Sequence, residues 1–318
     1  MLHEFVDMNG KMHDYELCGA EQWDNTVDVL MLAYNHGKYI AQAIESILMQ
    51  KTAYTYHIII GEDCSTDETR DIVKEYYYKY PDKITLLLWE HNVGADINSL
   101  ALLQKLKSEY VAVLEGDDYW INDRKLEKQI SFLETNKNYI ATGHNVKCVN
   151  ETGDLLHRNF DLYPIRDEHI YGSENAKRFE LAAQTASMVY RNFVKDWNEI
   201  QWKSFFQCKA NGDKKISVLL GLQGDVFFMK DIMAAHRRVF KGDSWTAKTT
   251  DRNLLWVLYQ FHKNIQQYVT EIFKMKLNLE DNCKALYNAS CQKFMENPNI
   301  DNFKVLYKLY KEKIKNAK

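Results

Sequence analysis

Three carboxylates lie within four residues in the stretch LEGDDYW at residues 114–120. The stretch follows the apolar run YVAVL, so Glu115, Asp117 and Asp118 are expected where a buried strand ends. Carboxylates this close repel one another unless water, a proton or a cation relieves the repulsion. Because proteins bind Mg²⁺ and Mn²⁺ through one or two carboxylates together with substrate phosphates, the spacing predicts a divalent-cation site at Asp117 and Asp118.

The same acids have a structural alternative. Arg124 and Lys125 follow them at the start of an expected helix, and these two cations could neutralise an acidic capping loop. The spacing is compatible with both interpretations. We favour the cation because residues suited to a nucleotide base follow earlier strands.

Polar residues also follow three earlier apolar runs. Residues 33–37 read AYNHG, residues 62–65 read EDCS and residues 90–94 read EHNVG. In parallel α/β sheets ligands bind outside the carboxyl ends of the strands. These segments and the acidic cluster are therefore expected to meet at one edge of the sheet.

Two residues of these segments have types that suit a nucleotide. Asp63 could accept a hydrogen bond from the ring N–H of a pyrimidine base, because Ser65, with capping-box spacing to Glu68, is expected to cap the next helix. Tyr34 offers a ring on which a base could stack. The alternatives are helix capping for Asp63 and simple packing for Tyr34.

Short apolar runs alternate with amphipathic stretches between residues 27 and 120, and these elements must position the polar segments. The alternation is typical of βαβ units that build an α/β fold with a mainly parallel sheet flanked by helices. Strands are expected at residues 27–34, 57–61, 84–89, 110–114 and 139–150, and helices at 40–48, 65–80, 95–107 and 123–136. The strands lack polar alternation, as burial on both faces requires.

The second half of the chain is less regular, with short expected strands and helices until it turns helical from Thr250. Without a flexible linker, one continuous domain is expected at residues 1–245. Residues 246–318 are expected to form a helical C-terminal extension.

The composition, with 46% hydrophobic and 27% charged residues, is that of a globular protein. The net charge of −3 gives no basic field, so we expect no nucleic-acid partner. The six cysteines are scattered without metal-finger spacing, which indicates a reduced, cytoplasmic compartment. The apolar runs are strand-sized rather than membrane-sized. Neither G-x-G-x-x-G nor a P-loop motif occurs, so we do not expect dinucleotide or P-loop chemistry.

The end of the chain, residues 300–318, has a basic amphipathic pattern. One helical face carries Phe303, Leu306, Tyr307, Tyr310 and Ile314, and another carries Lys304, Lys308, Lys311 and Lys315. Such a helix can lie on an anionic membrane, which would place the protein peripherally on the inner membrane face. A docked helix with a solvated lysine face is the alternative.

Three stretches resemble the N-terminal half of family 2 glycosyltransferases with a GT-A fold. They are VDVLMLAYNHGKYIAQAIESILMQ, HIIIGEDCSTDET and HNVGADINSLALLQKLKSEYVAVLEGDDYW, and the resemblance extends from residue 27 to about 135. It implies a nucleotide-diphosphate sugar donor, with UDP expected, and Mn²⁺ or Mg²⁺ as cofactor. It also implies inverting transfer to the hydroxyl of a glycan or lipid-linked acceptor, in surface-polysaccharide or glycan assembly. The resemblance further implies a nucleotide-binding half at residues 27–135 and an acceptor half at 136–245.

The resemblance also implies roles for single residues. By position, Asp63 matches the acid that reads the base, Tyr34 matches the aromatic beside it, and Asn98 matches a polar donor-site position. Ala33 and Asn35 belong to the same donor-binding loop as Tyr34. Residues 115–118 match the D-x-D region, with Asp117 toward ribose and metal and Asp118 toward the metal.

The second half resembles the family less. Asp225 in LQGDVFF lies where the family places the base that deprotonates the acceptor, and a turn aspartate after Gly224 is the alternative. Leu32 and Ala33 replace the usual Pro and Thr, and Glu115 replaces the usual first Asp. Phe240 stands where a metal-assisting His is common, so His236 or water would complete the metal shell.

Two other classes of protein compete with this interpretation. A sugar-phosphate nucleotidyltransferase would need a Gly- and Arg/Lys-rich first loop, whereas AYNHGKY offers one Gly and one Lys. A noncatalytic nucleotide-sugar-binding module would leave Asp225 without a role.

Overall fold

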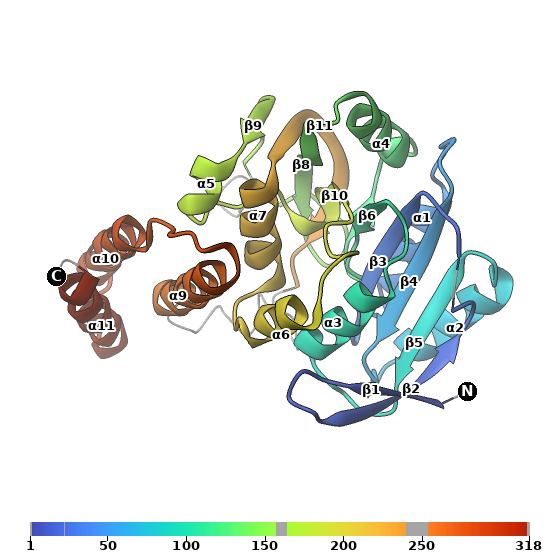
Figure 1. Cartoon of the computed structure of the whole chain (residues 1–318), viewed down its shortest axis with the longest axis horizontal. Coiled ribbons are helices and arrows are strands. Elements are labelled where there is room, and N and C mark those ends of the chain that lie inside the picture. Colours follow the sequence, from blue (N-terminus) through green and yellow to red (C-terminus); the bar gives the residue numbers. More distant parts are fainter. Residues whose placement is uncertain (1, 22, 157–163, 240–253, 317–318) are drawn as a thin grey trace. The chain divides into compact units, whose positions relative to one another are not determined.

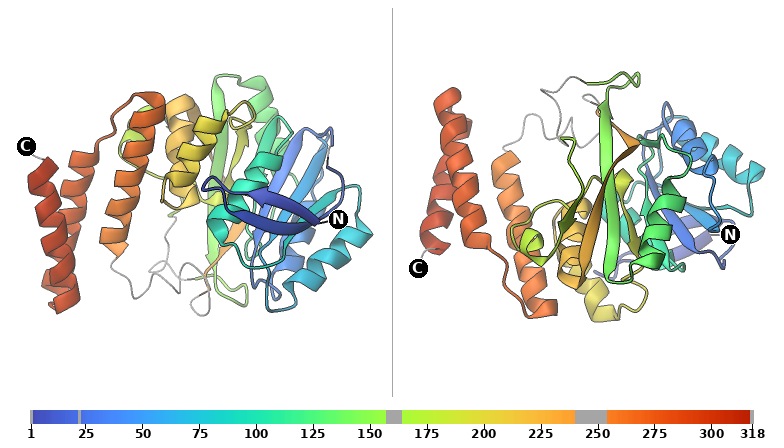
Figure 2. Two further views of the ribbon diagram at one scale, coloured as in Figure 1. Left: turned by 60° about the horizontal axis from the view of Figure 1, so that its bottom comes forward. Right: turned by 90° about the horizontal axis from the view of Figure 1, so that it is seen from above.

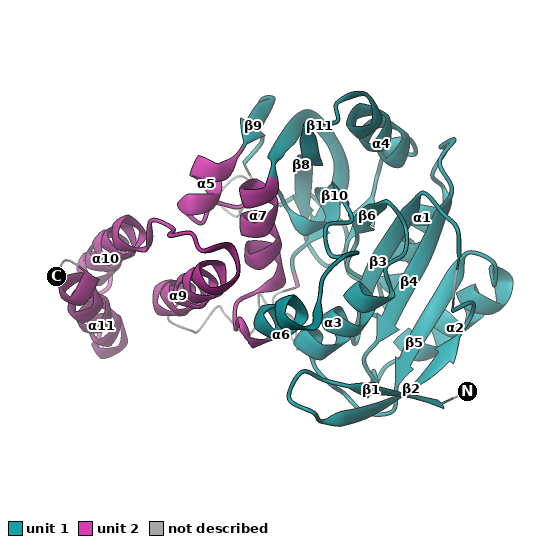
Figure 3. Cartoon of the chain, viewed as in Figure 1, with its two compact units in different colours: residues 1–171, 183–206, 224–238 teal, residues 172–182, 207–223, 239–318 magenta. Residues whose placement is uncertain are grey.

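The computed structural model describes the whole chain except residues 1, 22, 157–163, 240–253 and 317–318 (Figure 1). The chain divides into two compact units, which Figure 3 colours separately. Unit 1 consists of residues 1–171, 183–206 and 224–238, and unit 2 consists of residues 172–182, 207–223 and 239–318. Each unit is described by itself below.

Unit 1 is built on one mixed sheet. Its described strands are β1 (Leu2–Val6), β2 (Met12–Cys18), β3 (Val27–Ala33), β4 (Tyr56–Glu62), β5 (Ile84–Trp89), β6 (Tyr110–Val113), β7 (Tyr119–Trp120), β8 (Tyr139–Val149), β9 (His169–Tyr171), β10 (Val189–Arg191) and β11 (Asp225–Arg237). They lie in the order β1-β2-β5-β4-β3-β6-β10-β8-β11-β7, with β9 beside β11. The expected α/β fold is thereby confirmed, with strands close to the positions predicted from the apolar runs.

The strands β5, β4, β3 and β6 are parallel and form the centre of the sheet. Helices α1 (Ile40–Leu48), α2 (Thr69–Lys79), α3 (Ala95–Lys105) and α4 (Lys125–Thr135) accompany these strands along the chain. Every residue of β5 is buried, and α1 buries Ile40, Ile44 and Ile47 in the same core. Because parallel strands end at one edge, the loops after β3, β4, β5 and β6 begin at the same side of the sheet.

The outer strands of the described sheet are mostly antiparallel, which the expectation of a mainly parallel sheet did not include. The N-terminal hairpin β1–β2 pairs with β5, with Tyr15 opposite Trp89. Apolar runs did not reveal this hairpin because β2 reads MHDYELC, and one of its buried positions is His13.

The two long strands β8 and β11 follow the acidic cluster in the sequence. β8 and β11 run parallel side by side, with register shifts in β11 between Met229 and Ile232 (Figure 2). β11 also pairs with β7, placing Ala234 opposite Trp120 and Ala235 opposite Tyr119. This pairing brings the residues after Asp118 next to the end of β11.

The start of α2 differs from the expected capping box. Asp67 Oδ1 accepts hydrogen bonds from the Thr69 N–H at 3.0 Å and from the Thr69 hydroxyl at 2.5 Å. The prediction that Ser65 caps this helix was wrong, because the helix begins at Thr69, too late for Ser65 to reach its first amides.

Unit 2 is helical in its described part. It contains α5 (Ser173–Lys177), α7 (Gly212–Gln223), α9 (Leu254–Phe273), α10 (Leu279–Glu296) and α11 (Ile300–Asn316). The remaining described helices, the short 3₁₀ turn η2 (Thr185–Ser187) and most of α6 (Glu199–Gln207), belong to unit 1. Tyr259, Cys283, Val305 and Leu309 form the core between α9, α10 and α11. Among the helices described, none is long and apolar enough to cross a bilayer.

Candidate functional site

The loops after β3 and β4 are tied together by side chains acting on backbone amides. Asn35, which has a φ of 55°, donates its N–H to Ser65 Oγ at 3.0 Å and accepts the Thr66 N–H at Oδ1 at 2.9 Å. The Ala33 carbonyl accepts the Asp63 N–H at 3.0 Å. Tyr34 is half-buried in this loop. The structure therefore brings four of the predicted donor-site residues, Ala33, Tyr34, Asn35 and Asp63, to one edge.

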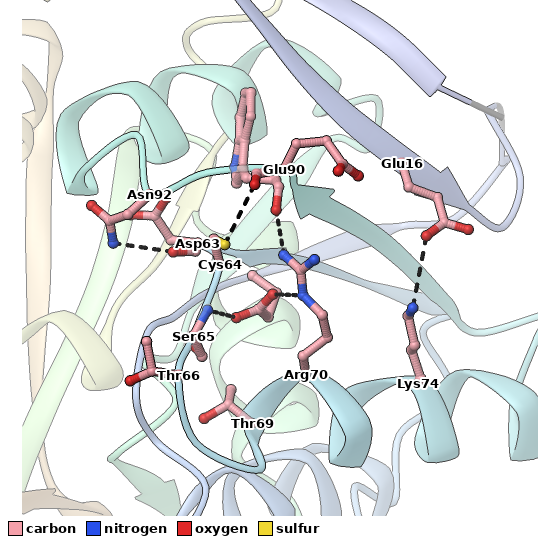
Figure 4. Close-up of polar contacts among 12 residues, drawn as sticks. Glu16, Asp63, Cys64, Ser65, Thr66, Thr69, Arg70, Lys74, Glu90 and Asn92 are labelled. Atoms are coloured by element: carbon pink, nitrogen blue, oxygen red, sulfur yellow. Dashed lines mark hydrogen bonds and ion pairs between the residues drawn. The ribbon is translucent and has the colours of Figure 1, made fainter.

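Glu62, which the sequence did not single out, fixes the second loop. Its side chain is fully buried, and Oε1 accepts the Ser65 N–H at 2.7 Å while Oε2 accepts Arg70 Nε at 2.5 Å. Arg70 also donates to the Trp89 carbonyl (Figure 4). A buried carboxylate is tolerated when paired and hydrogen-bonded, and here it holds the turn that presents Asp63.

Asp63 is buried at the predicted edge and bonded to the third loop. Its Oδ1 accepts the Val93 N–H at 2.7 Å, and its Oδ2 accepts the Gly94 N–H at 3.0 Å. Asn92 Nδ2 donates to the Asp63 carbonyl at 3.1 Å (Figure 4). Burial raises the pKa of the Asp63 carboxyl, although the two amides work in the opposite direction. A carboxylate has further lone pairs, so one more donor, such as a base N–H, is compatible with these bonds.

The third loop is also held from the N-terminal hairpin. His91 approaches His13, with Nε2 and Nδ1 3.3 Å apart, and His13 Nε2 lies 3.3 Å from Asp7 Oδ2. Because the carboxylate only accepts, His13 donates at Nε2. These residues were missed because the hairpin has no apolar run.

Asn98 lies beneath the loops with both ends of its amide engaged. Nδ2 donates to the Gly61 carbonyl at 2.8 Å, and Oδ1 accepts the indole N–H of Trp89 at 3.0 Å. A Cβ at Gly61 would lie 2.0 Å from Asn98 Oδ1, so only glycine leaves room for the amide. In this structure Asn98 joins β4, β5 and α3.

The carboxylate of Asp118 is enclosed by partners that are distant in the sequence. Oδ1 accepts the backbone N–H of Arg237 at 2.7 Å, Oδ2 accepts Gln184 Nε2 at 3.0 Å, and His236 Nδ1 lies 3.2 Å from both oxygens. Asp118 is 1% exposed. The β7–β11 pairing explains the arrangement, because it sets the end of β11 beside the acidic loop.

Histidines face both aspartates of this loop. Burial works against a charge on His236, but Asp118, with Asp117 and Glu115, raises the pKa of His236 to about 9. Burial raises the pKa of the Asp117 carboxyl, with the nearby His36 opposing and Asp118 adding to the effect. His36 Nε2 lies 4.0 Å from Asp117 Oδ2.

Arg237 holds the acidic loop with its side chain. Nε donates to the Asp117 carbonyl at 3.0 Å, and Nη2 donates to Gln42 Oε1 at 2.7 Å. Nη1 donates to the carbonyls of Asn150 and Glu151 at 3.2 and 3.0 Å. The guanidinium also lies 4.5 Å from the Tyr39 ring centroid and 5.3 Å from that of Tyr119. The only sequence signal was an arginine pair in HRR, too common to indicate this role.

The structural alternative for the acids, neutralisation by Arg124 and Lys125, is wrong for Lys125. Lys125 is fully buried, and its Nζ lies 4.2 Å from the centroid of the Trp120 ring. Asp117 and Asp118 instead contact His36, His236, Gln184 and Arg237.

The donor set fits a divalent cation that substrate oxygens complete. Across the described residues, no cluster of three His, Cys, Asp or Glu side chains forms a preformed metal site. Mg²⁺ and Mn²⁺ commonly bind one or two protein carboxylates when phosphates supply further ligands, and this loop offers two adjacent ones. His236 contacts Asp118, and whether His236 or water completes the metal shell stays a prediction, since Phe240 lies outside the described residues.

Asp225 is not brought to this group. It is the first residue of β11 and pairs with Tyr139, whereas His236, near the other end of the strand, contacts Asp118. At about 3.3 Å per residue, the eleven intervening steps span roughly 35 Å before the bulges shorten the strand. The expected role as acceptor base therefore lacks support from the placement of Asp225.

The comparisons with known proteins agree with this arrangement. Residues 28–198 match the sequence profile described as glycosyl transferase family 2. An uncharacterised protein of Mycobacterium tuberculosis is 29% identical over 233 residues, which are 72% of this chain and 63% of that protein, so the chain spans less than two thirds of this relative's length. An Escherichia coli protein named UDP-Glc:alpha-D-GlcNAc-diphosphoundecaprenol beta-1,3-glucosyltransferase WfaP is 34% identical over 115 residues, covering 36% of this chain and 44% of the relative.

A solved structure shares the fold. TarS of S. aureus, residues 1–349 with UDP-GlcNAc, superimposes with a TM-score of 0.60 at 16% identity, covering 92% of this chain and 82% of that one.

Proposed function

The chain belongs to glycosyl transferase family 2, and on that premise we propose that it transfers a sugar from a UDP-linked donor to the hydroxyl of a glycan or lipid-linked acceptor. The transfer is inverting, assisted by Mn²⁺ or Mg²⁺, and serves polysaccharide assembly at the cytoplasmic side of the membrane. The name of the E. coli relative, which includes a UDP-sugar and a diphosphoundecaprenol acceptor, supports the choice of donor and acceptor class.

One observation carries the proposal. The acidic loop, in which Asp118 is buried and held by Arg237 and His236, follows β6 at the same edge of the sheet where the loop of Asp63 follows β4. A nucleotide at this edge would meet Asp63 with its base and the acids with its diphosphate, because ligands of parallel sheets bind outside the strand ends.

The residues of the chain have separate tasks in the proposed reaction. Asp63 accepts the base N–H while its own position is fixed by the amides of Val93 and Gly94. Tyr34 and Asn35 line the same loop. When bound, a cation at Asp117 and Asp118 would neutralise the charge that grows on the departing nucleotide. Arg237 and His236 hold the two carboxylates in place.

The first loop argues against a nucleotidyltransferase. Such an enzyme holds a triphosphate with open backbone amides. Here the Asn35 N–H donates to Ser65 Oγ, the His36 N–H donates to Thr69 Oγ1 at 2.8 Å, and the Gly37 N–H donates to Asp67 Oδ2 at 2.8 Å. All three amides are already used, so the loop offers no cradle for phosphates.

A ligand panel tests the proposal. Thermal shifts are measured with UDP, GDP and CDP, each with Mn²⁺ and with EDTA, and donor hydrolysis is followed for UDP-sugars. We expect stabilisation by UDP that is larger with Mn²⁺ than with EDTA, and slow Mn²⁺-dependent release of UDP from one sugar nucleotide. Stabilisation without hydrolysis of any donor, and without transfer to polyprenyl-diphosphate acceptors, would favour a noncatalytic binding module.

A further inference from the structure

Helix α11 uses one narrow face to dock within unit 2. Its buried residues are Asn302, Val305 and Leu309, and the last two pack in the core with Tyr259 and Cys283. Glu312 turns the same way, since its carboxylate accepts the Tyr259 hydroxyl at 2.9 Å. The helix is therefore anchored, and its other faces point elsewhere.

A stripe of large apolar residues remains on the surface of α11. These residues, called the α11 stripe here, are Ile300, Phe303, Tyr307, Tyr310 and Ile314, with exposed fractions of 64%, 49%, 49%, 46% and 42%. They recur at steps of three and four, so they form one continuous line along the helix. The helix does dock, as the alternative predicted, but it docks through Val305 and Leu309 and leaves this line at the surface.

The α11 stripe is bordered by lysines. Helix α11 carries Lys304, Lys308, Lys311, Lys313 and Lys315 against the acids Asp301 and Glu312. Lys311 Nζ lies 4.5 Å from the Tyr307 ring centroid and Lys313 Nζ lies 4.4 Å from that of Tyr287, so positive charge lies beside the rings. The surface combines exposed apolar rings with an excess of positive charge, in a chain whose net charge is −3.

We propose that the α11 stripe binds the surface of an anionic lipid bilayer. Tyr and Phe rings with aliphatic neighbours are stable at the boundary between headgroups and acyl chains, and adjacent lysines attract lipid phosphates. A second copy of the chain fits this surface less well, because two stripes facing each other would bring their lysine borders together. The proposal concerns a surface of unit 2 and does not depend on the sugar donor or on transfer.

The test uses the full chain and vesicles of phosphatidylcholine with or without about one third phosphatidylglycerol. Sedimentation with vesicles at low salt should show binding to the anionic set and little to the neutral set. One variant replaces Phe303, Tyr307 and Ile314 by Ser, and another replaces Lys304, Lys308, Lys311 and Lys315 by Gln. Binding should fall by about fivefold for each lysine removed, and the serine variant should lose detectable binding.

Matched controls separate this surface from general exposure. The serine control replaces Tyr78, Leu155 and Ile200, which are 74%, 66% and 70% exposed in unit 1. The lysine control replaces the exposed Lys11, Lys107, Lys195 and Lys203 by Gln. Both controls should bind vesicles as the unmodified chain does. Three outcomes would each overturn the proposal. The first is an equal loss of binding in variants and controls, and the second is no vesicle binding by the intact chain. The third is a dimer that disappears only in the serine variant while no protein binds vesicles.

Discussion

Lys125 offers a sharp test of the buried interior described here, because replacing it by Met should stabilise the protein. Its side chain is fully buried, and within the described part of the chain its Nζ has no hydrogen-bond partner and lies over the Trp120 ring. An unsatisfied buried donor costs about 1–3 kcal/mol, and Met fills a similar volume without it. Losing the contact with the ring offsets part of this gain, since cation–π pairs contribute about 0.5–2 kcal/mol.

From the middle of each range, the expected net gain for Lys125→Met is about 1 kcal/mol of unfolding free energy. For a unit of this size it corresponds to a rise in Tm of about 2–4 °C. Circular dichroism melting gives the Tm of both proteins. The matched control is Lys128→Met on the same helix, where the lysine is 43% exposed and pairs with Asp231. This control should change Tm little, as surface substitutions do.

The gain should depend on pH with a defined sign. Burial lowers the pKa of Lys125 well below its usual range. The unfolded lysine then binds more protons than the folded one, so the stability of the natural chain rises with pH up to the unfolded pKa near 10.4. The Tm difference between Lys125→Met and the natural chain should shrink from about pH 7 to about pH 10. A lower Tm for Lys125→Met, or a difference independent of pH, would refute the assignment of Lys125 as an unpaired buried amine.

Asp63, Arg237 and Asp225 give three further tests. Asp63→Asn should weaken UDP binding equally with Mn²⁺ and with EDTA, because the expected partner of Asp63 is the base. Calorimetry measures the affinity. An unchanged affinity would mean that Asp63 serves only to hold the third loop. Arg237→Lys should lower turnover by about tenfold or more. Lysine keeps the charge but lacks the forked guanidinium that holds the Asp117 and Asn150 carbonyls. Unaltered turnover would contradict the positioning role of Arg237. Asp225→Asn should keep near-normal turnover because of its place at the start of β11, whereas a loss of about a hundredfold to ten-thousandfold would restore the role of general base.

The centre of the fold could be predicted from the sequence because its signals are local. Strands β3, β4, β5 and β6 are buried on both faces, so their apolar runs stand out without knowledge of their neighbours. The acidic loop could be found for the same reason, since adjacent carboxylates after an apolar run are visible in a few residues.

The partners of the site residues could not be predicted because they depend on contacts distant in the chain. Asp63 meets amides some thirty residues away, and Asp118 meets the backbone of Arg237 through a pairing of β7 with β11 that no local pattern indicates. Lys125 is part of an amphipathic helix pattern, which does not reveal that its amine lies against Trp120. The docking face of α11 was likewise ambiguous. Both the α11 stripe and the face that carries Val305 and Leu309 show apolar residues at helical spacing.

The central claim is that the acidic loop binds the donor nucleotide through a divalent cation. Calorimetric titration of UDP into the natural chain and into Asp118→Asn, each with Mn²⁺ and with EDTA, tests it most directly. The matched control is Asp123→Asn, which alters a half-buried acid five residues after Asp118 that pairs with Lys51. We expect Mn²⁺ to raise UDP affinity about tenfold or more in the natural chain and in the control, and to leave the affinity of Asp118→Asn unchanged. An equal gain from Mn²⁺ in all three proteins would contradict the claim.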